Sequence, residues 1–155
     1  GKDLYRKSLY TFWKRTVPPP SMMTFDAASR DLCTVKRQET NTPLQALVLL
    51  NDPQLIEASR LLAKTAMDAH LEKSEQISFI FKQATSRDPD EEELQMLDNY
   101  YSSMLEKVKN KGIGAEDYLS IGAYEIKGEY SKYKLAALAL TAHSILNLDE
   151  TISRG

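Results

Sequence analysis

Two segments of this 155-residue chain are apolar on nearly every side of a helix, and they constrain the fold more than any other feature. One covers residues 44–51 and the other residues 131–146. A helix that is apolar all round has no polar face to turn to water, so both segments are predicted to be nearly fully buried. On this basis we expect the substitution Leu47→Asp to abolish folding.

A repeated capping signal predicts where two helices begin. Thr42, Pro43 and Gln45 match a capping box with proline at the first helical position. Asp52 and Pro53 repeat the pattern of a capping residue followed by proline. The first apolar helix is therefore expected to end near residue 51, where a second helix begins almost at once.

Apolar residues spaced three and four apart predict the remaining helices. Asp90 and Glu93 form a further capping pair before one of them. The expected ranges are about 53–71, 74–86, 91–110 and a short helix at 115–121. With the two apolar segments they predict an all-α fold, a single compact bundle-like domain of five to six helices.

The domain organisation follows from length and charge. A chain of 155 residues fits one domain, 1–155, and its abrupt start suggests a fragment of a longer protein. Residues 1–40 form a basic arm rich in aromatic residues and proline, with eight Lys/Arg against four Asp/Glu, and residues 41–155 form an acidic helical body. Residues 4–16 fit both helical and strand periods, which favours an extended or mixed arm. Phe12 and Trp13 are expected to anchor it against the helical body.

Several functional classes find no support in the residue pattern. The chain has one cysteine and two histidines, none of them at metal-ligand spacing, so no metal or other cofactor is expected. A nucleophile elbow and a glycine-rich phosphate loop are both absent from the sequence. The pI of about 5.8 argues against a nucleic-acid partner, and no apolar run reaches the length of a membrane span. This pattern favours a non-catalytic role and leaves enzymatic activity open.

Polar residues flank both apolar segments: Arg37, Glu39, Thr40, Asn41, Asp149 and Glu150. Polar groups beside buried helices need hydrogen-bond partners, which favours a structural network. The alternative is a binding site formed by Arg37, Glu39, Asn41 and Asp149. A pocket that contains these groups would favour the alternative.

Five ordered segments resemble a known family. They lie at 6–15, 18–27, 37–53, 84–94 and 145–150, and the third reads Arg-Gln-Glu-Thr-Asn-Thr-Pro-Leu-Gln-Ala from residue 37 onward. They resemble the planctomycete-type C-terminal domain of unknown function (the PSD-one type, DUF1553). That family occurs in large, exported, multidomain proteins that are often associated with cytochrome c.

The resemblance implies an extracytoplasmic protein, periplasmic or on the cell surface, and it carries over no catalytic residue. It implies a helical module that supports or docks to neighbouring domains of the same full-length protein. Two alternatives stay open. The chain could be part of an enzyme or binding site acting on surface polysaccharide, or a docking surface for a cytochrome-like redox partner.

Overall fold

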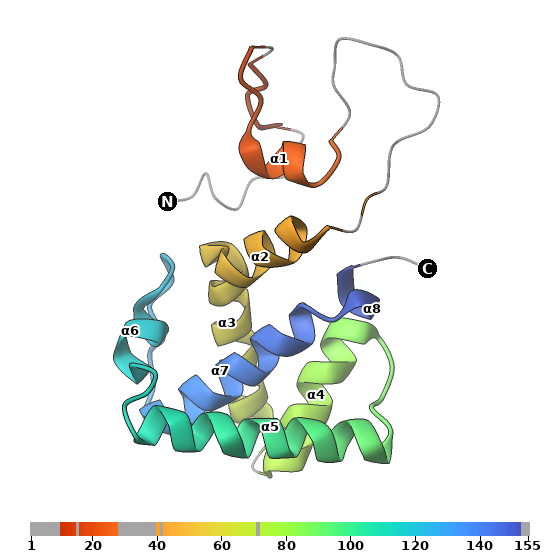
Figure 1. Cartoon of the computed structure of the whole chain (residues 1–155). Helices are drawn as coiled ribbons and strands as arrows, with labels where there is room; N and C mark the ends of the chain where they lie inside the picture. The colour runs from red at the N-terminus through yellow and green to blue at the C-terminus, as the bar shows by residue number, and fades with distance from the viewer. Residues whose placement is uncertain (1–9, 15, 28–39, 41, 71, 153–155) are drawn as a thin grey trace. The chain divides into compact units, whose positions relative to one another are not determined.

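The computed structural model describes residues 10–14, 16–27, 40, 42–70 and 72–152, and the α-helices in these ranges confirm the all-α class (Figure 1). In chain order they are α1 (Pro20–Thr24), α2 (Pro43–Asn51), α3 (Pro53–Ala69), α4 (Lys73–Thr85), α5 (Glu91–Lys109), α6 (Ala115–Ser120), α7 (Lys132–Leu146) and α8 (Asp149–Ile152).

The six helices expected from periodicity are present, with ends within two residues of the predicted ones. The described ranges contain eight helices rather than five to six, because α1 and α8 are added. These two helices have five and four residues. A helix of about one turn is too short to show a hydrophobic period, so sequence patterning does not detect it.

The chain divides into two compact units, Gly1–Asn51 and Asp52–Gly155. The first unit contains α1 and α2, and the second contains α3 to α8. The single domain expected from the sequence stays a prediction. Within this division α2 belongs with the arm segment rather than with the helical body.

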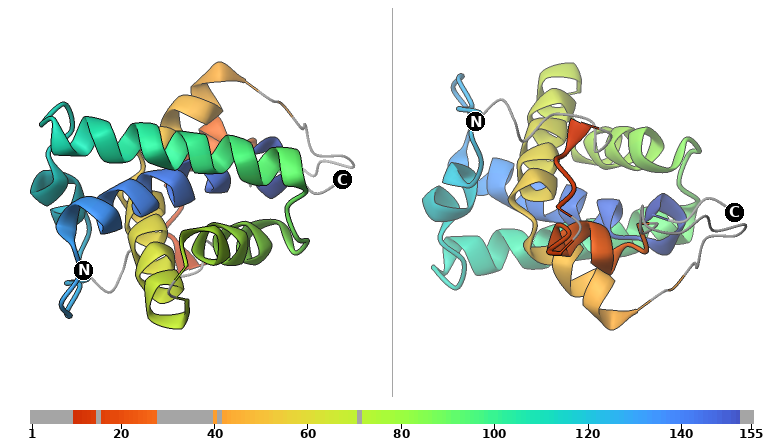
Figure 2. Two further views of the ribbon diagram at one scale, coloured as in Figure 1. Left: turned by 90° about the horizontal axis from the view of Figure 1, so that it is seen from below. Right: turned by 90° about the horizontal axis from the view of Figure 1, so that it is seen from above.

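Helix α7 is the central element of the second unit, with α3 packed on one side and α5 on the other (Figures 1 and 2). Nine of its fifteen residues are buried, which confirms the burial predicted for 131–146. Many of these are alanines, and on α3 Ala63 and Ala66 are also fully buried. Small side chains let two helix axes approach closely, and among the described helices α3 and α7 share the most extensive contact.

Helices α4 and α5 complete this core with larger side chains. Ile77, Ile80 and Phe81 of α4 are at most 2% exposed, and Tyr101 and Met104 of α5 are also buried. A reciprocal capping box starts α5, as expected from the sequence. In it the side chain at the cap and the glutamate three residues later each accept a backbone N–H, which satisfies two otherwise unpaired donors.

In the first unit, the prediction that residues 44–51 are nearly fully buried is wrong. Leu44 and Leu47 are each 57% exposed and Leu50 is 50% exposed, whereas Gln45 is buried. Among the described residues of this unit, α1 is the only other helix, and its five residues are too few to cover the nine of α2. The expected unfolding by Leu47→Asp therefore no longer follows.

The predicted anchoring role of Phe12 is also wrong, because this side chain is 83% exposed. Trp13 is half-buried. Residues 11–14 form no α-helix, in agreement with an extended or mixed arm.

Candidate functional site

The site predicted from the sequence is only partly within the described residues. Arg37, Glu39 and Asn41 lie outside them. Asp149 begins α8, is exposed, and lines neither of the two cavities described below. The grouping of these four residues into a binding site therefore stays a prediction.

The described part of the polar cluster before α2 forms a hydrogen-bonded network within the first unit. The carboxylate of Asp26 accepts both the backbone N–H of Thr40, at 2.8 Å, and its hydroxyl, at 2.5 Å. These two bonds hold the pKa of Asp26 below its usual value. The amide nitrogen of Gln45 donates to the carbonyl of Thr24 at 2.8 Å and to the Thr40 hydroxyl at 3.1 Å.

Gln45 also completes the capping box predicted for α2. Its side-chain oxygen accepts the Thr42 backbone N–H at 2.9 Å, and its own backbone N–H donates to the Thr42 hydroxyl at 3.3 Å. One buried side chain therefore caps α2 and ties it to the segment around Asp26. In these residues the polar cluster has a structural role.

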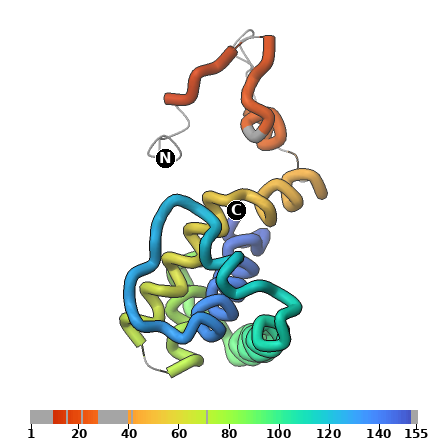
Figure 3. Tube along the Cα trace, turned by 90° about the vertical axis from the view of Figure 1, so that its left-hand side faces the viewer, coloured from red at the N-terminus to blue at the C-terminus, as the bar shows by residue number. Residues whose placement is uncertain are grey.

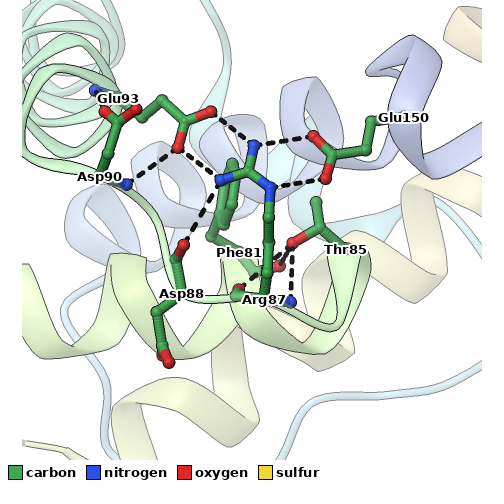
Figure 4. Close-up of polar contacts among 7 residues, drawn as sticks. All are labelled: Phe81, Thr85, Arg87, Asp88, Asp90, Glu93 and Glu150. Atoms are coloured by element: carbon green, nitrogen blue, oxygen red, sulfur yellow. Dashed lines mark hydrogen bonds and ion pairs between the residues drawn. The ribbon is translucent and has the colours of Figure 1, made fainter.

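A second network involves Glu150, the neighbour of Asp149. The guanidinium of Arg87 forms paired contacts with Glu150, at 2.7 and 2.8 Å, and with Glu93, at 2.6 and 2.8 Å (Figure 4). Its carbon lies 4.8 Å from the centre of the Phe81 ring. Arg87 therefore joins the start of α5 to α8, and it brings together the segments 84–94 and 145–150 that carry the resemblance.

The surface that stands out in the first unit is apolar. Leu44, Leu47 and Leu50 follow one another at intervals of three residues, which on an α-helix places them in one stripe. At 100° per residue this stripe lies roughly opposite Gln45, which faces the polar network. We call these three leucines the α2 apolar face.

The second unit contains two buried charged residues that the sequence analysis did not single out. Glu57 is 3% exposed and Arg60 is 2% exposed, both on α3. Glu57 accepts the backbone N–H of Ala123 at 2.5 Å, and Arg60 donates to the carbonyls of Ile121 and Tyr124. These bonds hold the segment that follows α6 against α3. Figure 3 shows the trace of this segment beside that of α3.

A cavity of about 530 Å³ lies beneath this segment, lined by Arg60 and by residues of α6, the following loop and the start of α7. Tyr124 and Tyr130 contribute aromatic walls. Lys132 and Glu116 also line it, but they pair with each other at 2.5 Å. Arg60 directs donors at backbone carbonyls of the loop, so its described bonds support the wall of the cavity.

Among the residues that the structure describes, neither histidine belongs to a group that could hold a metal ion. The Nδ1 atom of His70 lies 3.8 Å from Glu75, and Nδ1 of the buried His143 lies 3.5 Å from the Tyr118 hydroxyl oxygen. Burial raises the pKa of Tyr118. Within the described ranges no three His, Cys, Asp or Glu side chains are grouped to hold a metal ion. Among the described helices, none combines the length and apolar character that crossing a membrane requires.

Comparison with known protein families gave a match over most of the chain. A family model with the description "Protein of unknown function (DUF1553)" matches residues 1–101. Searches of the curated proteins and of the solved structures found no match. The family match covers the first unit, α3 and α4, and it ends within α5.

Proposed function

Since this chain belongs to the DUF1553 family, a family of unknown function, we propose that it is a non-catalytic helical module that docks to a neighbouring domain of a longer, exported protein. The observation that carries the proposal is the α2 apolar face. A helix that is capped at its N-terminus and tied to its own unit through Gln45 presents three leucines that are half or more exposed.

Exposed apolar residues are frequent in the first unit beyond α2. Val17, Met23 and Phe25 are 65%, 53% and 40% exposed. Soluble proteins rarely leave large contiguous apolar surface uncovered, and such surface commonly marks an interaction site. The concentration of these side chains in one short unit supports a partner for that unit.

The gain from covering the α2 apolar face is appreciable. Complete burial of a leucine side chain is worth roughly 1.5–3 kcal/mol, so covering three leucines that are about half exposed is worth roughly 2–4 kcal/mol. This is a modest energy for two separate proteins, but a domain of the same polypeptide is held at high effective concentration. An intramolecular partner therefore suits the size of this face.

The proposal is tested with Leu47→Asp in the full-length protein. We expect faster amide hydrogen exchange across residues 44–51 and in the covering domain, because a carboxylate at the centre of the apolar face cannot be buried without cost. The matched control is Met96→Asp, which places the same charge on α5 at a side chain that is 71% exposed. The control should leave both exchange profiles unchanged.

Three results would contradict the proposal. If Leu47→Asp unfolds residues 1–155 by circular dichroism, α2 is part of a folding core. If exchange across 44–51 is fast in the full-length wild type, no domain covers the face. Loss of binding to a haem protein or to polysaccharide, with unchanged exchange at 44–51, would assign the face to an external partner.

A further inference from the structure

A separate cavity in the second unit combines an apolar wall with basic side chains. It has a volume of about 580 Å³ and is lined by residues from α3, α4, α5 and α7. Pockets for small molecules commonly measure about 300–1,000 Å³ and are mostly apolar with a few polar groups. The cavity contains no residue of the α2 apolar face, so it is independent of the docking proposal.

The apolar wall is formed by Met67, Tyr101 and Leu105. Tyr101 is 6% exposed, and burial together with the nearby charge of Asp98 raises the pKa of its hydroxyl. The ring therefore remains uncharged at neutral pH. Methionine adapts to partners of different shape, so this wall suits the apolar body of a small molecule.

The basic side chains are Lys73, Lys109 and Lys134. Lys73 is held by the carboxylate of Asp98, at 2.6 and 2.8 Å. Among the described residues, no carboxylate lies within ion-pair distance of Lys109 or Lys134.

Both lysines are exposed to solvent, and the lining contains one acid, Glu106. The cavity therefore carries a net positive charge, although residues 52–155 hold twelve Lys/Arg against eighteen Asp/Glu. A local excess of positive charge in an acidic unit attracts anions to this site.

We propose that the cavity binds a small organic carboxylate with an apolar body. The apolar body packs against Tyr101 and Leu105, and the carboxylate pairs with Lys109 and Lys134. A bare inorganic anion would leave the apolar wall uncovered. A neutral ligand would leave the two ammonium groups without a counter-charge.

The test is an NMR titration of the ¹⁵N-labelled chain with 4-phenylbutyrate, 4-phenylbutanol and inorganic phosphate. We expect phenylbutyrate to shift amide signals of Ser102 and of the other lining residues, with phenylbutanol binding at least about tenfold more weakly. The double variant Lys109→Gln/Lys134→Gln should weaken phenylbutyrate binding by a similar factor. The control double variant Lys107→Gln/Lys127→Gln removes two exposed lysines outside the cavity and should leave binding unchanged.

Several outcomes would overturn the proposal. They are an absence of shifts at the lining residues, equal binding of the alcohol and the carboxylate, and equal shifts with phosphate alone. Equal loss of binding in the two double variants would also overturn it, because the effect would then come from overall charge.

Discussion

Gly122 holds the loop after α6 in a conformation that other residues adopt at a cost. Its φ is +102°, in the region that favours glycine. A Cβ atom added there would lie 2.8 Å from the Cβ of Glu57 and 2.1 Å from one of its carboxylate oxygens. Glu57 is 3% exposed and accepts the N–H of Ala123, so its side chain cannot move aside without losing that bond.

The expected cost of Gly122→Ala has two parts. Alanine in this backbone conformation costs about 1–3 kcal/mol. Displacing the Glu57 carboxylate from the Ala123 N–H costs about 1.5–3 kcal/mol, because the bond involves a charged acceptor. A total of about 2.5–6 kcal/mol should lower the unfolding midpoint by roughly 10–25 °C for a unit of this size.

The assay is thermal unfolding of residues 1–155, followed by circular dichroism at 222 nm. The matched control is Gly112→Ala, because an added Cβ there meets nothing closer than the carbonyl oxygen of Lys107 at 3.4 Å. The control should change stability by less than about 1 kcal/mol. The reasoning would be refuted if the unfolding midpoint of Gly122→Ala lay within about 3 °C of the midpoint of Gly112→Ala.

Two further predictions concern the contacts of Arg87. The hydrogen bonds from Arg87, and to a smaller extent the one from the backbone N–H of Asp90, lower the pKa of Glu93 from 4.5 to about 2. Arg87 also lowers the pKa of Glu150. A carboxylate whose pKa is lowered by folding stabilises the folded state at pH values above its unfolded-state pKa, and this contribution is lost as the pH falls. The free energy of unfolding measured in urea should therefore drop between pH 4.5 and 2. This drop should be smaller in Arg87→Leu than in the wild type. Equal drops in the two proteins would contradict the conclusion that Arg87 lowers the two pKa values. Phe81→Ala should cost about 3–5 kcal/mol in urea unfolding, because the ring is 2% exposed; a loss below about 1 kcal/mol would show that the site is not packed.

The two apolar segments show what sequence patterning predicts and what it does not. The capping box before α2 and the continuous apolar run of α7 predicted the positions of the two helices correctly, because these signals are local. Burial depends on how much surrounding chain is available to cover a helix. Helix α7 is surrounded by several long helices, whereas α2 belongs to a unit whose other described helix has five residues. The same apolar pattern therefore gives a core helix in one place and an exposed face in the other.

The buried charges of α3 could not be predicted from local pattern. The hydrophobic period of α3 predicts that Glu57 and Arg60 face solvent, because charged residues are rarely buried without partners. Their described partners are backbone groups of the loop, more than sixty residues further along the chain. The contact of Arg87 with Glu150 spans sixty-three residues. Such bonds join residues that are far apart in the sequence and can be identified only from the folded structure. The sequence therefore indicated Glu150 as a polar residue but could not predict that Arg87 is its partner.

The position of α7 in the chain has a consequence for biosynthesis. Helices α3, α4 and α5 emerge from the ribosome first, each with an apolar side that α7 covers in the finished unit. At about 5–20 residues per second, the delay between residue 69 and residue 146 lasts roughly 4–15 seconds. During that interval the nascent chain exposes its future core, which is the kind of apolar surface that chaperones bind. A nascent chain that stalls before α7 would remain in this exposed state.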